Sequence, residues 1–191
     1  MSAMKTTLRT TTPADLDGAR KINQAVSSHP DKTDDQWKLA FMKYVDYYPL
    51  FAPESSFVLE GEDGEILAYL FSEEDSMRFF SLLEKEFKPA MDALQPGAFE
   101  QFVESQQFMK DFYDEYPAHL HIDVLPKCQN QKAGSRLMEA CLAKLKADGV
   151  KGVCLGVNKD RPQAIHFYEK NGFTVLDESE LSQVMGKKLS D

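Results

Sequence analysis

Three polar side chains alternate along one short β-prone segment. His119, His121 and Asp123 occupy every second position of this run, and side chains at alternate positions of a strand share one face of its sheet. The positions between them are apolar: Leu120, Ile122 and Val124. The apolar face belongs to a core, so the strand lies inside a sheet. Imidazole and carboxylate groups exchange protons near neutral pH, and the polar face therefore carries groups suited to acid–base chemistry.

Three interpretations of this polar face remain open. It is a solvated face of an antiparallel strand, which is a common arrangement, or it lines a functional cleft. A metal site is the least favoured, because a strand spaces alternate side chains by about 7 Å, near the limit for one ion. No fourth ligand is apparent in the sequence, so we predict no metal.

The segment after this strand has the composition of an anion site. Residues 125–136 lead into a helix, whose first N–H groups and positive dipole end attract phosphate. Lys127, Lys132 and Arg136 add charge there, and Gly134 permits close backbone approach. Neither G-x-x-x-x-G-K-[ST] nor G-x-G-x-x-G is present, so no nucleoside-triphosphate loop or dinucleotide fingerprint is predicted. An ordinary polar helix start remains the alternative.

The whole composition is that of a folded chain in a reducing compartment. The 191 residues suit a single domain over 1–191, and 42% hydrophobic residues with 13 Phe and 7 Tyr exclude a disordered chain. No apolar run approaches the roughly 18 residues of a spanning helix, and the polar start is unlike a signal peptide. Three cysteines without a C-x-x-C pair favour a reduced, cytoplasmic protein.

Charge is distributed unevenly along the chain. The net charge of −9 argues against nucleic acid and anionic membranes as partners. Residues 72–118 hold 11 acidic against 4 basic side chains, whereas residues 125–171 hold 9 basic against 4 acidic. This asymmetry predicts an anionic ligand beside an acidic face that would attract a cationic partner.

Periodicity and turn residues predict a mixed α/β or α+β fold. Strands are expected near residues 5–9, 56–60, 66–71, 119–124, 152–157, 173–176 and 183–189. Helices are expected to begin near residue 12 and to cover about 34–47, 75–87, 98–113, 134–148 and 162–170, with Pro49 and Pro53 ending the second of them. The two helices within 72–118 form an insertion before the central strand. Three roles are open for it: packing against the sheet edge, a lid over the acceptor site, or a homodimer surface.

Three motifs in order resemble the GNAT superfamily of N-acetyltransferases. Gln129-x-x-Lys132-x-Gly134 resembles the family's Q/R-x-x-G-x-G/A, and AIHFYEKNGF at 164–173 resembles its A-I-x-x-Y-x-x-x-G-F. Two short segments near the start, Leu8-Arg9 and Thr12-Pro13-Ala14-Asp15-Leu16, are also typical of family members. The segment around YPAHLHID, 116–123, further resembles acetyltransferase-like domains associated with some O-GlcNAc-hydrolases. The resemblance implies a mixed, mostly antiparallel twisted sheet flanked by helices.

The resemblance also implies acetyl-CoA as co-substrate and a set of residues that bind it. That set is Val124, Leu125, Gln129, Asn130, Gln131, Lys132, Ala133, Gly134, Ser135, Arg136, Asn158 and Phe167. A backbone N–H near Val124 or Leu125 is the implied oxyanion donor. Tyr168 aligns with the family's tyrosine acid, which protonates the departing thiolate. His121 and Asp123, on the polar strand face, are the candidates for the base.

The resemblance thus implies direct acetyl transfer in a ternary complex to a primary amine of a small molecule or peptide, and the acidic face favours a cationic acceptor. The chain departs from the family at Lys132 and Asn130, where glycine is frequent, and at Arg161, where many members have Asn. These departures leave open a catalytically weak or inactive module that binds acyl-CoA or docks a protein.

Overall fold

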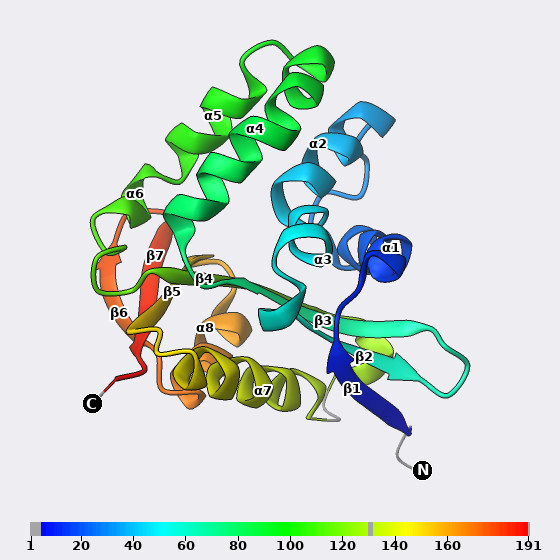
Figure 1. The fold of residues 1–191 in the computed structure, drawn as a ribbon, viewed down its shortest axis with the longest axis vertical. Coiled ribbons are helices and arrows are strands. Elements are labelled where there is room, and N and C mark those ends of the chain that lie inside the picture. Colours follow the sequence, from blue (N-terminus) through cyan, green and yellow to red (C-terminus); the bar gives the residue numbers. More distant parts are fainter. Residues whose placement is uncertain (1–4, 130–131, 191) are drawn as a thin grey trace.

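Within residues 5–129 and 132–190, the part of the chain that the computed structural model describes, seven strands form one sheet in the order β1-β2-β3-β4-β5-β7-β6 (Figure 1). The strands are β1 Thr6–Thr10, β2 Phe57–Gly61, β3 Ile66–Glu73, β4 Ala118–Val124, β5 Gly152–Asn158, β6 Thr174–Glu178 and β7 Ser182–Lys188. β4 is the fourth of the seven, so the prediction of an internal strand is confirmed. Neighbouring strands pair antiparallel except β4 and β5, which run parallel.

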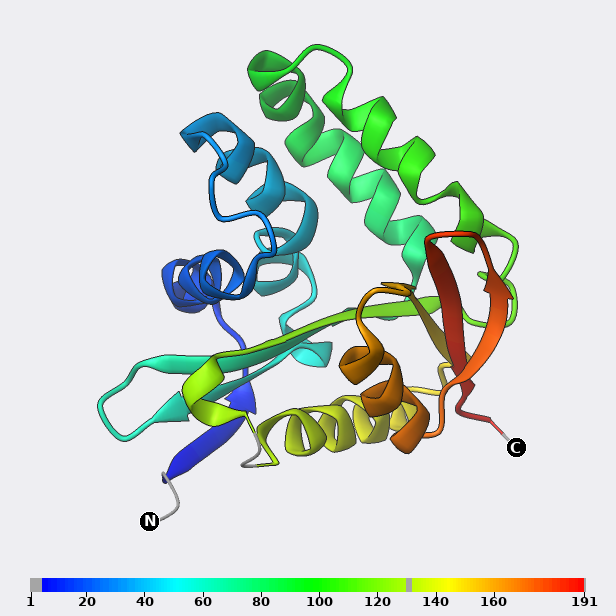
Figure 2. The ribbon, with the colours of Figure 1, turned by 180° about the vertical axis from the view of Figure 1, so that it is seen from behind.

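Helices cover both faces of this sheet. They are α1 Leu16–Val26, α2 Asp34–Tyr44, α3 Tyr47–Phe51, α4 Ser76–Leu94, α5 Ala98–Ser105, α6 Gln107–Lys110, α7 Ala133–Ala147 and α8 Pro162–Lys170. The view from behind shows α7 and α8 on one side of the sheet and α1 to α3 on the other (Figure 2). The mixed, mostly antiparallel α/β architecture predicted from the sequence is therefore confirmed.

The alternation along β4 divides its side chains between two cores. Leu120 and Ile122 pack with residues of α7, such as Leu137, and with Tyr168 of α8. On the opposite face of the sheet, α1 to α5 bury a second core that includes Tyr48, Tyr69 and Phe71. The polar face of β4 points toward this second, helix-covered side, so it is not an open solvated face.

Three helix ends differ from the sequence expectation. Pro49 does not end a helix but lies inside α3, because α2 already stops at Tyr44. α4 continues through Pro89 to Leu94, well past the expected end near residue 87, and Met91 in this last part is fully buried. Core packing of Met91 therefore outweighs the backbone hydrogen bond that proline removes. The helix expected over 98–113 is divided at Gln106 into α5 and α6.

None of the helices in the described residues combines the length and apolarity needed to cross a membrane.

Candidate active site

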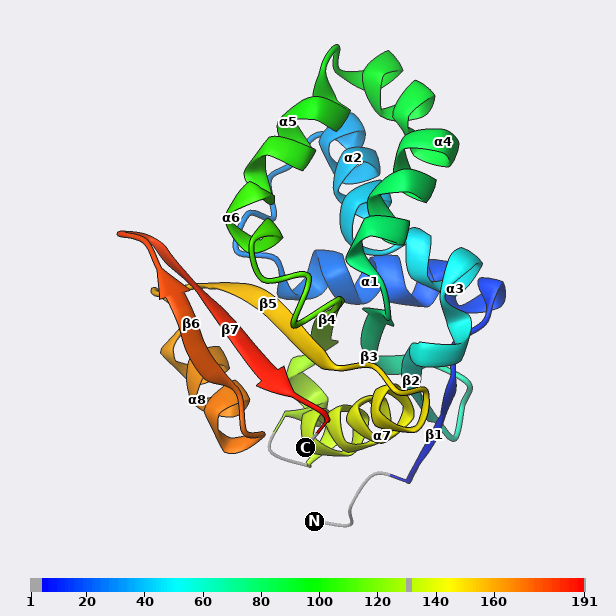
Figure 3. The same ribbon diagram turned by 60° about the vertical axis from the view of Figure 1, so that its left-hand side comes forward.

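The parallel strands β4 and β5 pair only at their beginnings. Their register contains Ala118 with Val153 and His119 with Cys154, and no later pair. Beyond these positions β4 continues beside β3, and β5 continues beside β7. Beyond His119 and Cys154, β4 and β5 are therefore not hydrogen-bonded to each other. We term this gap in the sheet the β4–β5 opening. In Figure 3 the α6 end of the insertion lies above β5, while α1 lies above β3.

The backbone of β4 presents hydrogen-bonding groups toward this opening. The Leu125 N–H donates to Leu67 O of β3 at 3.0 Å, and backbone groups alternate between the two edges of an antiparallel strand. The N–H and C=O of Val124 therefore face the opposite edge, toward β5. Gln129 Nε2 donates to the Val124 carbonyl oxygen at 3.4 Å. Of the two oxyanion donors considered from the sequence, Leu125 is already engaged and Val124 is the one directed to the opening.

Asp123 lies on the open half of β4 within a small hydrogen-bond network. Tyr69, its direct neighbour on β3, donates its hydroxyl hydrogen to Asp123 Oδ2, and Asn23 of α1 donates from Nδ2 at 3.3 Å. Burial raises the pKa of Asp123 above its ordinary value, although the hydrogen bonds from Tyr69 and Asn23 and the charge of Arg161 act against this rise. The result is a carboxyl group with increased proton affinity at the opening.

His119 is the innermost of the three polar residues and is fully hydrogen-bonded. Ser76 Oγ donates to Pro117 O at 2.8 Å, so the 2.9 Å contact between Ser76 Oγ and His119 Nδ1 places the proton on Nδ1. Tyr48 then donates its hydroxyl hydrogen to Nε2, also at 2.9 Å. Burial lowers the pKa of His119 to about 3. His119 is therefore a neutral structural residue, which satisfies its neighbours and has no free nitrogen for catalysis.

His121 has a different environment two residues further along β4. The rings of Tyr44 and Tyr48 pack edge-on against its imidazole, each at 5.6 Å between centroids. Burial lowers the pKa of His121 to about 4, so the imidazole is neutral at pH 7. Its side chain remains partly exposed, on the same face as Asp123.

Tyr168 of α8 approaches the opening from the other side of the sheet. Its ring packs between Phe167 and Phe173, with both centroids at 5.6 Å. Burial raises the pKa of Tyr168 above its ordinary value, and the charge of Asp123 adds to this rise while that of Arg161 opposes it. The fold thus brings Tyr168 and Asp123 within electrostatic reach of each other, although they are separated by 45 positions in the sequence.

The loop expected to bind phosphate joins β4 to α7. Asn130 and Gln131 lie outside the described residues. Lys132, directly before α7, has a φ of 60°, and it is the one non-glycine residue with positive φ within 5–129 and 132–190. This left-handed conformation is the one that glycine adopts most readily. Lys132 therefore keeps the backbone shape of the glycine that the family pattern has at this position.

The other predicted cofactor residues have different surroundings. A Cβ atom on Gly134 would come within 3.2 Å of the Phe167 ring, so this glycine lets α7 and α8 approach each other closely. Ala133 is buried in the core and Ser135 is exposed. The Arg136 guanidinium is engaged elsewhere, donating to Thr6 Oγ1 of β1 at 2.5 Å. Asn158 is exposed at the end of β5.

The cysteines do not form part of this site as nucleophiles. Cys128, Cys141 and Cys154 are free and buried. Burial raises the pKa of both Cys141 and Cys154 to about 12, so neither carries a thiolate at neutral pH. Within the described ranges, no group of three or more His, Cys, Asp or Glu residues is arranged to hold a metal ion.

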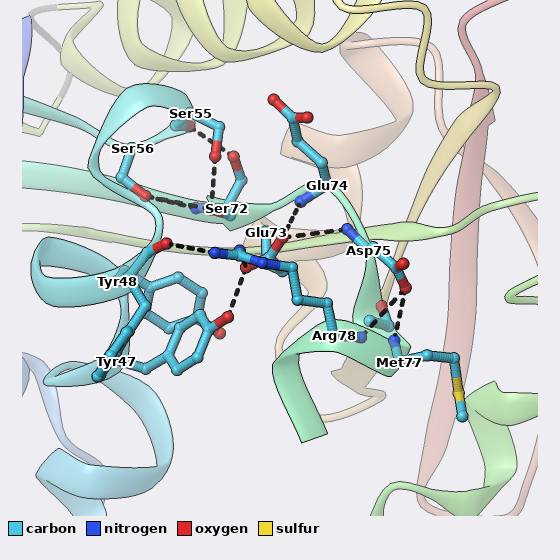
Figure 4. A network of polar contacts seen from close by, with 12 residues as sticks. Tyr47, Tyr48, Ser55, Ser56, Ser72, Glu73, Glu74, Asp75, Met77 and Arg78 are labelled. Carbon is cyan, nitrogen blue, oxygen red and sulfur yellow. Dashed lines mark hydrogen bonds and ion pairs between the residues drawn. The ribbon is translucent and has the colours of Figure 1, made fainter. Parts of the chain in front are cut away.

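A second polar cluster lies at the far end of β3, beside a hollow of about 340 Å³. Glu73 is buried there and accepts hydrogen bonds from Tyr47 Oη at 2.6 Å and Arg78 Nη1 at 2.5 Å (Figure 4). The backbone N–H groups of Glu74 and Asp75 donate to its other oxygen. The carboxylate is thus satisfied by the protein itself, and the cluster anchors the start of α4.

Tyr69 and Asn23 belong to the candidate site but are not among the residues predicted from the sequence. In the sequence, Tyr69 looks like one more apolar residue of a buried strand, and Asn23 looks like a polar residue of an amphipathic helix. The alternation of β3 could have placed Tyr69 on the polar face, once the pairing of β3 with β4 was known.

Comparison with known proteins gives a consistent result. A family model described as "Acetyltransferase (GNAT) family" matches residues 19–173. Protein O-GlcNAcase from Rattus norvegicus is 26% identical over 129 residues, and the same protein from Mus musculus matches equally. This match covers 61% of the chain but only 14% of the relative.

Solved structures share the fold over nearly the whole chain. The protein in the crystal structure of SsHAT is 24% identical in sequence to this chain. The two structures superpose with a TM-score of 0.86, over 98% of this chain and 100% of that one. The ribosomal-protein-S18-alanine N-acetyltransferase from Escherichia coli is 19% identical, with a TM-score of 0.60 and coverage of 98% and 96%. At these identities the likeness establishes the fold.

Proposed function

The chain belongs to the acetyltransferase (GNAT) family, and on this premise we propose that it transfers an acetyl group from acetyl-CoA to a primary amine by direct attack in a ternary complex. The observation that carries this proposal is the convergence of Asp123, Tyr168 and the Val124 N–H at the β4–β5 opening. These three groups come from both faces of the sheet and from its open edge. They match the needs of acyl transfer, namely a base, an acid and a donor to the developing oxyanion.

The residues at the opening fit an acyl-CoA. The Val124 N–H is directed toward it, and within 5–129 and 132–190 the Val124 carbonyl accepts one long hydrogen bond, from Gln129 at 3.4 Å. The start of α7 supplies N–H groups for phosphate oxygens, with the ammonium of Lys132 beside them. We assign binding to Val124, Gln129 and residues 130–135 first. Arg136 ties α7 to β1, so its contribution is to position the loop.

Asp123 is the better candidate for the base. An amine must lose a proton before it attacks, and a carboxyl group whose pKa is raised by burial is a stronger base than an exposed one. His121, with a pKa of about 4, accepts a proton much less readily than an ordinary histidine. We assign His121 to the wall of the acceptor site.

Tyr168 is assigned as the acid. Its raised pKa keeps the phenol protonated throughout the neutral range, so the hydroxyl always has a proton to give. In the reaction, the amine nitrogen forms a bond to the acetyl carbon and the thioester C–S bond breaks. The proton from the amine passes to Asp123, and the departing sulfur receives a proton from Tyr168.

The glycine-like backbone at Lys132 supports an active enzyme over a module that has lost its cofactor site. The cytoplasm is the proposed location, since three buried free thiols fit a reducing compartment.

The first test is a calorimetric titration of the purified chain with acetyl-CoA and with desulfo-CoA, followed by a thiol-release assay over a panel of amines. Micromolar binding of both ligands and amine-dependent release of CoA are expected. Binding without turnover by any amine would favour the inactive module, and the absence of binding would overturn the proposal.

A further inference from the structure

Two residues of opposite charge lie on the two sides of the β4–β5 opening. Asp123 is the last residue but one of β4. Arg161 precedes α8 directly, and its backbone N–H donates to Asn158 O at 3.1 Å, which fixes it to the end of β5. The divergence of the two strands therefore places these residues on opposite sides of the same gap.

The two charges interact without forming an ion pair. The charge of the Arg161 guanidinium opposes the rise that burial causes in the pKa of both Asp123 and Tyr168, so this charge reaches the reacting groups. Among the described residues, however, the side chain of Arg161 makes no hydrogen bond and has no carboxylate oxygen within 4 Å. Asp123 is satisfied by Tyr69 and Asn23 instead. Both charges remain available to a bound molecule.

The surrounding groups do not neutralise Arg161. His119 and His121 are neutral at pH 7, with pKa values of about 3 and 4. On the helical side, Lys43 of α2 is half-buried with its ammonium 5.8 Å from the Phe102 ring centroid. Phe102 in turn contacts Tyr44, which contacts His121. Lys43 is thus a cation of the helical side that is connected to His121 through these two rings.

The acidic insertion holds several of its carboxylates in ion pairs. Several of its carboxylates are paired with basic side chains: Glu73 with Arg78, Asp92 and Glu100 with Lys88, and Glu115 with Lys188. Arg78 and Lys88 already belong to the 4 basic residues of this segment, so of these pairs only that of Glu115 with Lys188 reduces its net negative charge. Among the described residues, the charges that act on the proposed acid and base are the Asp123 carboxylate and the Arg161 guanidinium.

We propose that the acetyl acceptor is an amino acid or a similarly small amino carboxylate, whose carboxylate binds Arg161 while its amine lies at Asp123. A guanidinium enclosed by bound substrates loses its hydration, and a carboxylate replaces that hydration with charge-assisted, bidentate hydrogen bonds. A diamine would instead bring a second cation toward Arg161. This inference rests on the proposed acetyl transfer and specifies its substrate class.

The test compares acceptors that differ only in the carboxylate. Wild-type protein is assayed with the twenty L-amino acids, with their primary amides, and with putrescine, by thiol release from acetyl-CoA. For at least one amino acid, we expect kcat/KM to exceed that of its amide and of putrescine by tenfold or more. Arg161→Gln is expected to reduce this acid-to-amide ratio to near one, and Arg161→Lys to an intermediate value, since an ammonium keeps the charge without the bidentate geometry.

Lys159→Gln is the matched control. It removes a cation from the same loop, but one already paired with Glu178 at 2.9 Å, so the acid-to-amide ratio should persist. The urea-unfolding midpoint of Arg161→Gln, compared with that of the wild type, shows whether this variant folds. Two outcomes would overturn the inference and leave the proposed function standing. One is that amides or putrescine are acetylated as efficiently as amino acids, and the other is that the acid-to-amide ratio is unchanged in Arg161→Gln. Failure of every amine with acetyl-CoA bound would overturn the proposed function itself.

Discussion

Tyr69 stands directly opposite Asp123 in the β3–β4 register and donates its hydroxyl hydrogen to the Asp123 carboxylate. Tyr69 is completely buried and its ring stacks on Phe71 at 4.1 Å between centroids. The packing therefore fixes the position of the hydroxyl, and the hydroxyl fixes the carboxylate. Tyr69 is a positioning residue for the proposed base.

Replacing Tyr69 by Phe should move the acidic limb of the kcat/KM profile toward higher pH. The hydrogen bond from Tyr69 stabilises the charged carboxylate and so lowers the pKa of Asp123, which means that its loss raises that pKa. The base form then disappears at a higher pH. Tyr48→Phe, which removes a buried hydroxyl from the same face but one bound to His119, should leave this limb in place. An unshifted limb in Tyr69→Phe would argue against Asp123 as the base.

Tyr168→Phe should lower kcat by about 10²- to 10⁴-fold, the usual contribution of a general acid. The ring and its contacts with Phe167 and Phe173 are retained, so the affinity for acetyl-CoA by titration should not change. Tyr113→Phe is the control, because it removes the hydroxyl of another buried tyrosine that packs with Phe80 away from the opening. Equal turnover by wild type and Tyr168→Phe would exclude the acid role.

Lys132→Gly should stabilise the protein by about 0.5–1 kcal/mol in urea unfolding. A side chain in the left-handed region costs about 1–2 kcal/mol, and the greater freedom that glycine has in the unfolded chain offsets part of that gain. Lys132→Ala removes the same ammonium but keeps the strain, so it should show no such gain. Comparable stability of the two variants would contradict the strain inferred from the φ of 60°.

The sequence was most informative where local patterns decide the structure. Alternation along β4 correctly placed His119, His121 and Asp123 on one face and Leu120 on the other. It could not distinguish the two histidines, because their difference comes from distant residues. Tyr48, which fixes Nε2 of His119, is 71 positions away, and Ser76 is 43 positions away.

Long-range contacts also explain the other omissions. Asn23 reaches Asp123 across 100 positions, and only the packing of α1 against the sheet reveals it. Likewise a helix end was expected near residue 87, whereas the burial of Met91 keeps α4 intact through Pro89 to Leu94. The identity of the strand neighbours, rather than the existence of the strands, is the information that a single sequence lacks.

Gly134 should show energetic coupling to Phe167. Alanine normally favours a helix over glycine by about 1 kcal/mol, but a Cβ at this position would lie 3.2 and 3.3 Å from two atoms of the Phe167 ring and 3.7 Å from Ile122. Overpacking of this kind costs about 1–3 kcal/mol, so Gly134→Ala alone should destabilise the protein. In a Phe167→Leu background the ring edge is gone, and the same substitution should become neutral or stabilising.

The double-mutant cycle measures this coupling directly. Urea unfolding of wild type, both single variants and the double variant should give an interaction free energy of about 1 kcal/mol or more, as expected for residues in contact. Ser135→Ala, one position further along α7 and exposed, should be additive with Phe167→Leu. Additivity at Gly134 would contradict the close contact between Gly134 and the Phe167 ring.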